Sequence, residues 1–440
     1  MSFTLRRFSI FALPLCGFLP PLPFRSLSDS SALCQAECFR TACLVPFAFT
    51  VKTAFSMSHH PVFTLLFLAV LSAFSCSDAT ARRLYVKPPK ARRGVEAVCT
   101  ETINRTIAQA AGGDTVVIPA GLWRTSTIRL KSHMTLLIEE GATLVAHPDP
   151  ESYGHYVPTH DMSRFDTGAG TRNANLTGDA RWTRALILGQ NIENVSICGG
   201  GTIDGTHIED SLGEESMRGP HTLLLAEAEN VSVDNVRFVR ASNYAVLGYE
   251  LEGCRFSRLT IEQGWDGIHI RGGEDTIIED CDIATGDDAL AGGYWQGMII
   301  RNCRLNSSCN GLRIIEPSQQ VTVKDCRISG PGRFPHRTRL ERPIAEPLPE
   351  GHDLIYGIVI EPGAWGKAPG RTDGILIENV SIDNTWAPVA YSMGDDNTCG
   401  SLTMKNVNAT HIRGVAQPIN RQDCVKSWEV MTLENVKVSK

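Results

Sequence analysis

The sequence predicts an all-β fold, namely a single-stranded right-handed parallel β-helix of about 22 residues per turn with a short N-terminal capping helix. Three observations lead to this prediction. A short phrase recurs along the chain, and a second phrase recurs beside it at the same spacing. The composition combines 39 glycines with 7% aromatic residues, which is typical of a turn-rich β protein rather than a helical one.

The first recurring phrase consists of Asn or Asp, a small apolar residue, and a strand of alternating polar and apolar residues. Its copies at Asp280, Asn302 and Asp325 are 22 and 23 residues apart. Short alternating strands at such a spacing indicate a stacked coil, in which each turn buries its face only against its neighbours. The polar residues predict a turn ladder, because Asn and Asp tolerate left-handed backbone and bond to neighbouring amides. The ladder comprises Asn235, Asp280, Asn302, Asp325, Asn379, Asn406 and Asn435.

Cysteines occupy the small apolar place in three copies of this phrase. Cys281, Cys303 and Cys326 stand where other copies carry valine, which predicts a buried thiol stack rather than reactive cysteines. Nine of the 14 cysteines follow Cys76. An odd number in an exported domain argues against a complete disulfide framework.

The second recurring phrase has a variable residue, a small residue and an aliphatic residue. Its first four copies begin at Tyr244, Asp266, Asp288 and Asn310, 22 residues apart, and a further copy begins at Tyr356. Stacked turns lie about 4.8 Å apart, so Asp266, Asp288 and Asn310 should form one line on the outer surface. The aliphatic residue faces the core, so the residue after it faces out. These outward residues are Leu247, His269, Ala291, Arg313 and Val359.

The remaining segments fit around this stack. Residues 1–56 are expected to be an unstructured or mis-assigned extension, and 57–84 a signal-peptide region with a short apolar run, which predicts a secreted or periplasmic protein. A lipid anchor at Cys76 is the alternative. Residues 85–440 form the predicted β-helix domain, in which 95–112 can provide the capping helix. Two long polar insertions, 149–184 and 329–354, are expected to wall a binding face.

Three aspartates carry the candidate chemistry. Asp266, Asp287 and Asp288 lie on two adjacent predicted turns, and like charges so close raise at least one pKa. Glycoside hydrolysis needs that arrangement, with one carboxylic acid and one carboxylate. Gly-Asp-Asp is also a common turn, and an outward Asp stack also suits calcium. The register of the three aspartates, away from the turn ladder, favours the catalytic interpretation.

From about residue 113 to 400 the chain resembles glycoside hydrolase family 28, the polygalacturonase family. The segments Leu136–Leu144 and Gly199–Gly205 are similar to that family, the latter matching Gly-x-Gly-x-Ile-Asp-Gly. Asp266 matches the aspartate of its Asn-Thr-Asp, and Asp287 and Asp288 match its Asp-Asp pair. The resemblance implies inversion without a metal or other cofactor. It also implies Asp287 as the general acid, with Asp266 and Asp288 holding the attacking water.

Two family motifs differ here. Gly-His-Gly is replaced by Cys309-Asn310-Gly311, and Arg-Ile-Lys by Val359-Ile-Glu361. The phrase from Asn310 resembles the surroundings of Arg-Ile-Lys, so Arg313 is a candidate remnant with one turn lost. Both uronates and neutral sugars therefore remain candidate substrates.

The predicted substrate-binding residues flank the aspartate line, and they are His269, Asn310, Arg313, Tyr244 and Tyr356. His269 either tunes the aspartates or is a surface side chain, and Arg313 either binds an acidic substrate or neutralises carboxylates. Further aromatic candidates for sugar stacking are Tyr294, Trp295 and Trp365. Basic residues of the second insertion, which favour an anionic glycan or are simply solvated, are Arg333, His336, Arg337, Arg339 and Arg342.

Two other functions fit the same scaffold. A polysaccharide lyase or epimerase would need a calcium site, or a neutralising arginine beside a base such as Tyr356. A non-catalytic glycan-binding β-helix is the other alternative. The net charge of −6 supplies no basic field for nucleic acid. We therefore expect no nucleic-acid partner. We also expect a monomer without an integral membrane span, whose partner is a polysaccharide or oligosaccharide substrate.

Overall fold

The computed structural model describes residues 81–89, 98–168, 175–336, 352–363, 368–422 and 424–440. The expected N-terminal extension, nearly all of the signal-peptide region and Cys76 lie outside these residues, as do Arg337, Arg339, Arg342 and Trp365. Among the described residues, no helix has the length and apolar character that a membrane crossing needs.

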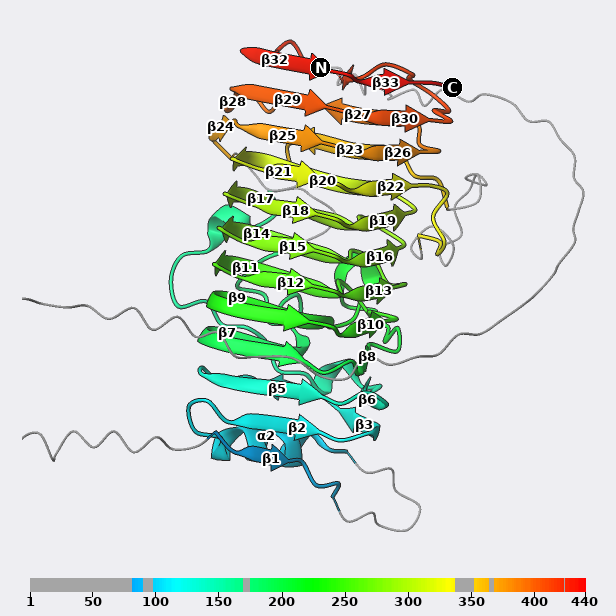
Figure 1. Cartoon of the computed structure of the whole chain (residues 1–440). Helices are drawn as coiled ribbons and strands as arrows, with labels where there is room; N and C mark the ends of the chain where they lie inside the picture. The colour runs from blue at the N-terminus through cyan, green and yellow to red at the C-terminus, as the bar shows by residue number, and fades with distance from the viewer. Residues whose placement is uncertain (1–80, 90–97, 169–174, 337–351, 364–367, 423) are drawn as a thin grey trace, which may run out of the picture. The chain divides into compact units, whose positions relative to one another are not determined.

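Two long sheets run the length of the solenoid (Figure 1). The 20-stranded sheet contains β1 (Arg83–Tyr85), β2 (Thr115–Ile118), β4 (Ile128–Arg129), β5 (Met134–Ile138), β7 (Ala185–Cys198), β9 (His221–Asp234), β11 (Val246–Glu252), β12 (Arg255–Ser257), β14 (Ile268–Glu274), β15 (Ile277–Glu279), β17 (Leu290–Gln296), β18 (Ile299–Arg301), β20 (Asn310–Gln319), β21 (Thr322–Lys324), β23 (Tyr356–Glu361), β25 (Ile375–Glu378), β27 (Ala387–Tyr391), β29 (Ser401–Lys405), β31 (Asn420–Arg421) and β32 (Val430–Glu434). The 11-stranded sheet contains β3 (Gly121–Thr125), β6 (Ala142–Ala146), β8 (Thr202–Asp204), β10 (Arg237–Val239), β13 (Thr260–Glu262), β16 (Asp282–Thr285), β19 (Arg304–Ser307), β22 (Arg327–Ser329), β26 (Ser381–Asp383), β30 (Asn408–Thr410) and β33 (Lys437–Val438).

The smaller elements are the strand pair β24 (Gly370–Thr372) and β28 (Asn397–Cys399), the 3-10 turns η1 (Pro150–Ser152), η2 (Ser163–Phe165) and η3 (Glu214–Ser216), and the helix α2 (Thr100–Gln109). Strand β1 pairs with β2 in parallel, so the solenoid pairing already includes the residues around the domain boundary expected at 85. Helix α2 lies beside the first strands and buries Ile103 and Ile107 in the core, which confirms the predicted capping helix.

The strand register confirms the predicted right-handed parallel β-helix. Each strand of one turn pairs in parallel with the equivalent strand of the next, and Ile268, Leu290 and Leu312 are partners at 22-residue steps. Aliphatic side chains of successive turns therefore stack inside the coil and form one continuous core.

The predicted cysteine stack and turn ladder are both present. Cys281, Cys303 and Cys326 are buried and free, and none of the nine cysteines that the structure describes forms a disulfide. Each residue of the predicted ladder has a left-handed backbone, with φ from 51° for Asn235 to 56° for Asp280. Side-chain amides connect neighbouring turns, since Asn435 Nδ2 donates to Asn406 Oδ1 at 2.9 Å.

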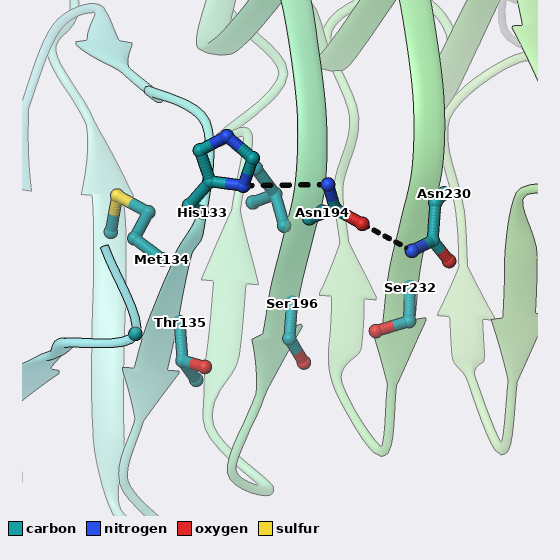
Figure 2. A pocket seen from close by; sticks show the side chains of 9 residues that line it. His133, Met134, Thr135, Asn194, Ser196, Asn230 and Ser232 are labelled. Carbon is teal, nitrogen blue, oxygen red and sulfur yellow. Dashed lines mark hydrogen bonds between the residues drawn. The ribbon is translucent and has the colours of Figure 1, made fainter. Parts of the chain in front are cut away.

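Polar outward residues stack in the same register. Figure 2 shows Thr135, Ser196 and Ser232 on the adjacent strands β5, β7 and β9, where they are register partners. Above them Asn194 Oδ1 accepts a hydrogen bond from Asn230 Nδ2 at 2.5 Å. Equivalent residues of successive turns therefore stack on the outside of the coil as well as inside it, which is what the predicted aspartate line requires.

The first insertion covers part of the outer face. Tyr156, Phe165 and Trp182 pack against the outward residues of β9 and β11 and form a second hydrophobic cluster outside the coil. The described residues of the first insertion thus lie against the outer face of the coil. The outward residues of β9 and β11 were expected on the outer surface, but the insertion covers them and they are buried.

Candidate active site

The predicted line of polar residues is present. Asp266 and Asp288 precede β14 and β17, and Asn310 begins β20. The backbone continues the parallel pairing through these positions, because Gly267 N donates to Asp288 O and Ala289 N donates to Asn310 O, both at 3.0 Å. The line nevertheless does not lie on an open surface, since both aspartates are buried.

His269 fixes the side chain of Asp266. Its Nδ1 lies 2.7 Å from Asp266 Oδ2, and its Nε2 accepts a hydrogen bond from Arg271 Nε at 3.4 Å. The imidazole is therefore neutral, with its proton on Nδ1. Burial, together with Arg271 and Arg313, lowers the pKa of His269. Burial and the two neighbouring aspartates raise the pKa of Asp266 well above its ordinary value.

Asp287 contacts a guanidinium and an imidazole. Its Oδ2 lies 3.1 Å from Arg218 Nη2 and 3.3 Å from His336 Nε2. Burial opposes ionisation, but His336 and Arg218 outweigh it and hold the pKa of Asp287 below its usual range. The Asp287 side chain is also the most accessible of the three, at 17% exposed against 5% for Asp266 and 4% for Asp288.

Asp288 has weaker partners. Asn310 Nδ2 donates to its Oδ1 at 2.8 Å, and Arg313 Nη1 lies 3.7 Å from its Oδ2. Burial and the charge of Asp287 raise the pKa of Asp288 to about 6. Below about pH 6 the cluster therefore holds one carboxylate, Asp287, beside carboxyl groups that retain a proton, which is the pairing that acid–base catalysis uses.

Arg218 is the central cation of the site. It is buried, lies over the ring of Trp265 at 5.1 Å, and contacts Glu215 at 2.8 Å and Glu214 at 3.6 Å. The two glutamates lie in the turn η3, four and three residues before Arg218. One short segment between β8 and β9 therefore supplies the arginine and both glutamates.

Arg313 is neutralised on two sides. Its Nε lies 2.9 Å from Glu361 Oε1, opposite the contact with Asp288. Val359, the register partner of Arg313 on the next turn, is buried. Strand β23 thus carries neither cation of the motif Arg-Ile-Lys, and the guanidinium of Arg313 already has two carboxylate partners.

One group of donor atoms could hold a metal ion. A carboxylate oxygen from each of Asp287 and Asp288 and the Sγ of Cys309 lie within 4.8 Å of one another. A thiol with carboxylates is a zinc-type donor set rather than a calcium-type one. Arg218 already supplies positive charge to Asp287, so the site has its own counter-charge.

The four predicted aromatic residues that the structure describes lie in different surroundings. Tyr356 is half-buried and is the register partner of Asn310, so it stays beside the line. Tyr244 is buried and stacks on His269 at 4.9 Å with the rings 3° apart, so its ring supports the histidine where a sugar face was expected. Trp295 is part of the inner core, which corrects its predicted place near the line. Tyr294 packs against Phe165 of the first insertion.

Sequence reasoning did not predict the place of three ionisable residues in the site. Arg218 and Glu214 lie in a segment without periodicity, and nothing in the sequence points to them. His336 was noted as one of the basic residues of the second insertion, but its contact with Asp287 depends on the path of that loop.

Removal of the Asp288 charge is expected to stabilise the fold at neutral pH. The pKa of Asp288 is about 6 in the folded protein and lower in the unfolded chain, so its ionisation lowers the free energy of unfolding by about 3 kcal/mol as pH rises from about 4 through 6. Asp288→Asn should therefore unfold at higher denaturant concentration than the parent at pH 8, and at the same concentration at pH 3.5. The exposed Asp396→Asn is the control. Equal unfolding midpoints of Asp288→Asn and the parent at pH 8 would show that the ionised Asp288 does not destabilise the fold.

Comparisons with known proteins agree with this fold. A family model described as a right-handed beta helix region matches residues 197–398, which include all three aspartates. A probable polygalacturonase of Vitis vinifera is 29% identical over 194 residues, covering 41% of this chain and 37% of the relative. Polygalacturonase QRT2 of Arabidopsis thaliana is 26% identical over 127 residues, covering 26% and 28%. The chain thus spans roughly a third of the length of these relatives.

Solved structures are similar over more of the chain. The polygalacturonase from Erwinia carotovora ssp. carotovora superposes with a TM-score of 0.57 at 18% identity, covering 82% of this chain and 94% of the other. The exopolygalacturonase from Thermotoga maritima has a TM-score of 0.55 at 17% identity, covering 75% and 81%. At these identities the likeness establishes the fold.

Proposed function

We propose that this chain, a right-handed β-helix similar to glycoside hydrolase family 28, is an exported glycoside hydrolase that cleaves O-glycosidic bonds of a polysaccharide. The observation that carries the proposal is the cluster of two buried aspartates, Asp266 and Asp288, with the partly exposed Asp287, in which the surroundings drive the protonation states apart. The polygalacturonase relatives support the same reaction class.

The charges suggest a division of roles. Glycoside hydrolysis needs a carboxylic acid that protonates the leaving oxygen and a carboxylate that activates water. Asp287, ionised beside Arg218 and His336, fits the carboxylate, and Asp288 fits the acid. The resemblance implies the opposite for Asp287, so the roles are a point to test. Asp266, held by His269, is the uncharged partner that fixes the geometry of the pair. Inversion at the anomeric carbon follows the resemblance.

The surroundings of Arg313 bear on the substrate. A uronate carboxylate at the cleaved sugar would need a free cation, and Arg313 is paired with Asp288 and Glu361. Val359 and Glu361 stand where a cationic pair would grip that carboxylate. We therefore favour a neutral sugar at the point of cleavage, in a pectin-like or other glycan. Export, to the outside or the periplasm, rests on the apolar run near residue 65, and a monomer is sufficient for this site.

The function is tested by incubating the parent protein and Asp287→Asn with a panel of neutral and acidic plant, algal and bacterial glycans. New reducing ends without the ultraviolet absorbance of an unsaturated product, absent in Asp287→Asn, are the expected result. An unsaturated product would identify a lyase instead. Folded parent protein that binds glycans but cleaves none would identify a binding module.

A further inference from the structure

Three arginines gather on the outside of the 11-stranded sheet. Arg304 on β19 and Arg327 on β22 are register partners, and Asp282 on β16 precedes them in the same column. Arg333 reaches this column from the loop after β22. Together they line a surface pocket of about 310 Å³, whose walls comprise Asp282, Arg304, Leu305, Asn306, Arg327, Ser329 and Arg333.

The pocket carries more positive than negative charge. Asp282 is its one acidic wall residue, and it is shared by Arg304 Nη2 at 3.1 Å and Arg333 Nη2 at 3.0 Å. Arg327 also lines the pocket, and its charge helps to lower the pKa of Asp383. The Arg304 side chain is 72% exposed, so its guanidinium is available to a ligand.

Other outward arginines of the same sheet region are balanced differently. On β10 and just after it, Arg237 pairs with Glu262 and Arg240 with Asp204, one carboxylate to one guanidinium. Around Arg304, by contrast, three arginines line a pocket that has a single acidic wall residue.

The arginine from the loop is held in place. Asn306 Oδ1 accepts a hydrogen bond from Arg333 N at 2.7 Å, and Asn306 Nδ2 donates to Ser329 O at 2.7 Å and Pro331 O at 2.8 Å. Three residues later the same segment brings His336 to Asp287. One short loop therefore borders both the arginine pocket and the carboxyl cluster.

We propose that this pocket is an accessory subsite for an anionic group of a glycan chain, either a carboxylate or a sulfate ester. Guanidinium groups bind both anions through paired hydrogen bonds. Asp282 precedes Asp287 by five residues, which span at most about 18 Å when extended, so one oligosaccharide can reach from the pocket to the cluster. The inference goes beyond the proposed function, because binding there does not require cleavage.

The test measures binding in the Asp287→Asn background, which prevents turnover. A fluorescently labelled oligogalacturonide, a sulfated galactan oligosaccharide and a neutral galactan oligosaccharide are titrated at low salt into this protein. The titrations are repeated after adding Arg304→Gln and Arg327→Gln together, and separately Arg237→Gln, a matched exposed arginine on the same sheet.

We expect at least one anionic ligand to bind about tenfold more weakly to the double arginine variant, while Arg237→Gln and the neutral ligand show no change. The ligand that responds identifies carboxylate or sulfate. Equal affinity of both anionic ligands for the two proteins, or no binding of either to the starting protein, would overturn the subsite. Cleavage of the glycan panel by protein with an intact Asp287 is measured separately, so failure of this subsite and failure of the proposed hydrolase are distinguishable.

Discussion

Asp288→Asn should slow cleavage of the natural glycan by about 10²–10⁴-fold, yet leave hydrolysis of an aryl glycoside with an acidic phenol nearly unchanged. An acidic leaving group departs without a proton, so it no longer needs the general acid. The prediction follows from the raised pKa of Asp288, about 6, beside a carboxylate that stays ionised. The measurement is kcat/KM for both substrates, from about pH 4 to 8.

Asp287→Asn is the matched variant for this experiment. It should lose activity on both substrates, because water must still be activated whatever the leaving group. Added azide, which needs no base, should restore turnover of the aryl glycoside. If Asp287→Asn rather than Asp288→Asn keeps the aryl glycoside activity, Asp287 is the acid and the roles are those implied by the family resemblance.

Arg218→Met should destabilise the fold by about 3–5 kcal/mol, because it leaves buried carboxyl groups without their cation. Arg218 is the shared partner of Glu214, Glu215 and Asp287, and it lies over Trp265. The variant also removes a charge that lowers the pKa of Asp287. The acidic limb of the activity profile should therefore move to higher pH.

The matched control is Arg237→Met, which removes an exposed ion pair with Glu262 and should change stability by less than about 1 kcal/mol. Urea unfolding followed by circular dichroism measures both variants, and the pH profile of kcat/KM reports on Asp287. A variant at position 218 that is as stable as the control, with an unmoved acidic limb, would mean that Arg218 is peripheral to the cluster.

The periodic part of the chain made the coil and the line of aspartates predictable. A 22-residue spacing determines which residues become partners, so Asp266, Asp288 and Asn310 could be aligned without coordinates. The cysteine stack and the turn ladder followed from the same spacing, since each occupies one fixed place in the repeated phrase.

The surroundings of that line were not predictable, because they come from segments without a period. Arg218 and His336 reach Asp287 from loops whose paths depend on tertiary packing. Trp182 of the first insertion packs on Tyr244, and Tyr244 stacks on His269, so both are buried although strand alternation alone placed them on the surface. The repeat therefore predicted where the carboxyl groups lie. Their protonation states depend on neighbouring side chains that only the structure identifies.

The column that contains His269, Ala291, Arg313 and Val359 has an evolutionary consequence. Gain or loss of one whole repeat moves a side chain past the carboxyl cluster by about 4.8 Å, and the strand register restores the backbone hydrogen bonds after each step. A guanidinium can thus migrate between the position of Val359 and that of Arg313 without any redesign of the coil. Insertions of a full turn offer such a protein a route to new sugars that single substitutions do not.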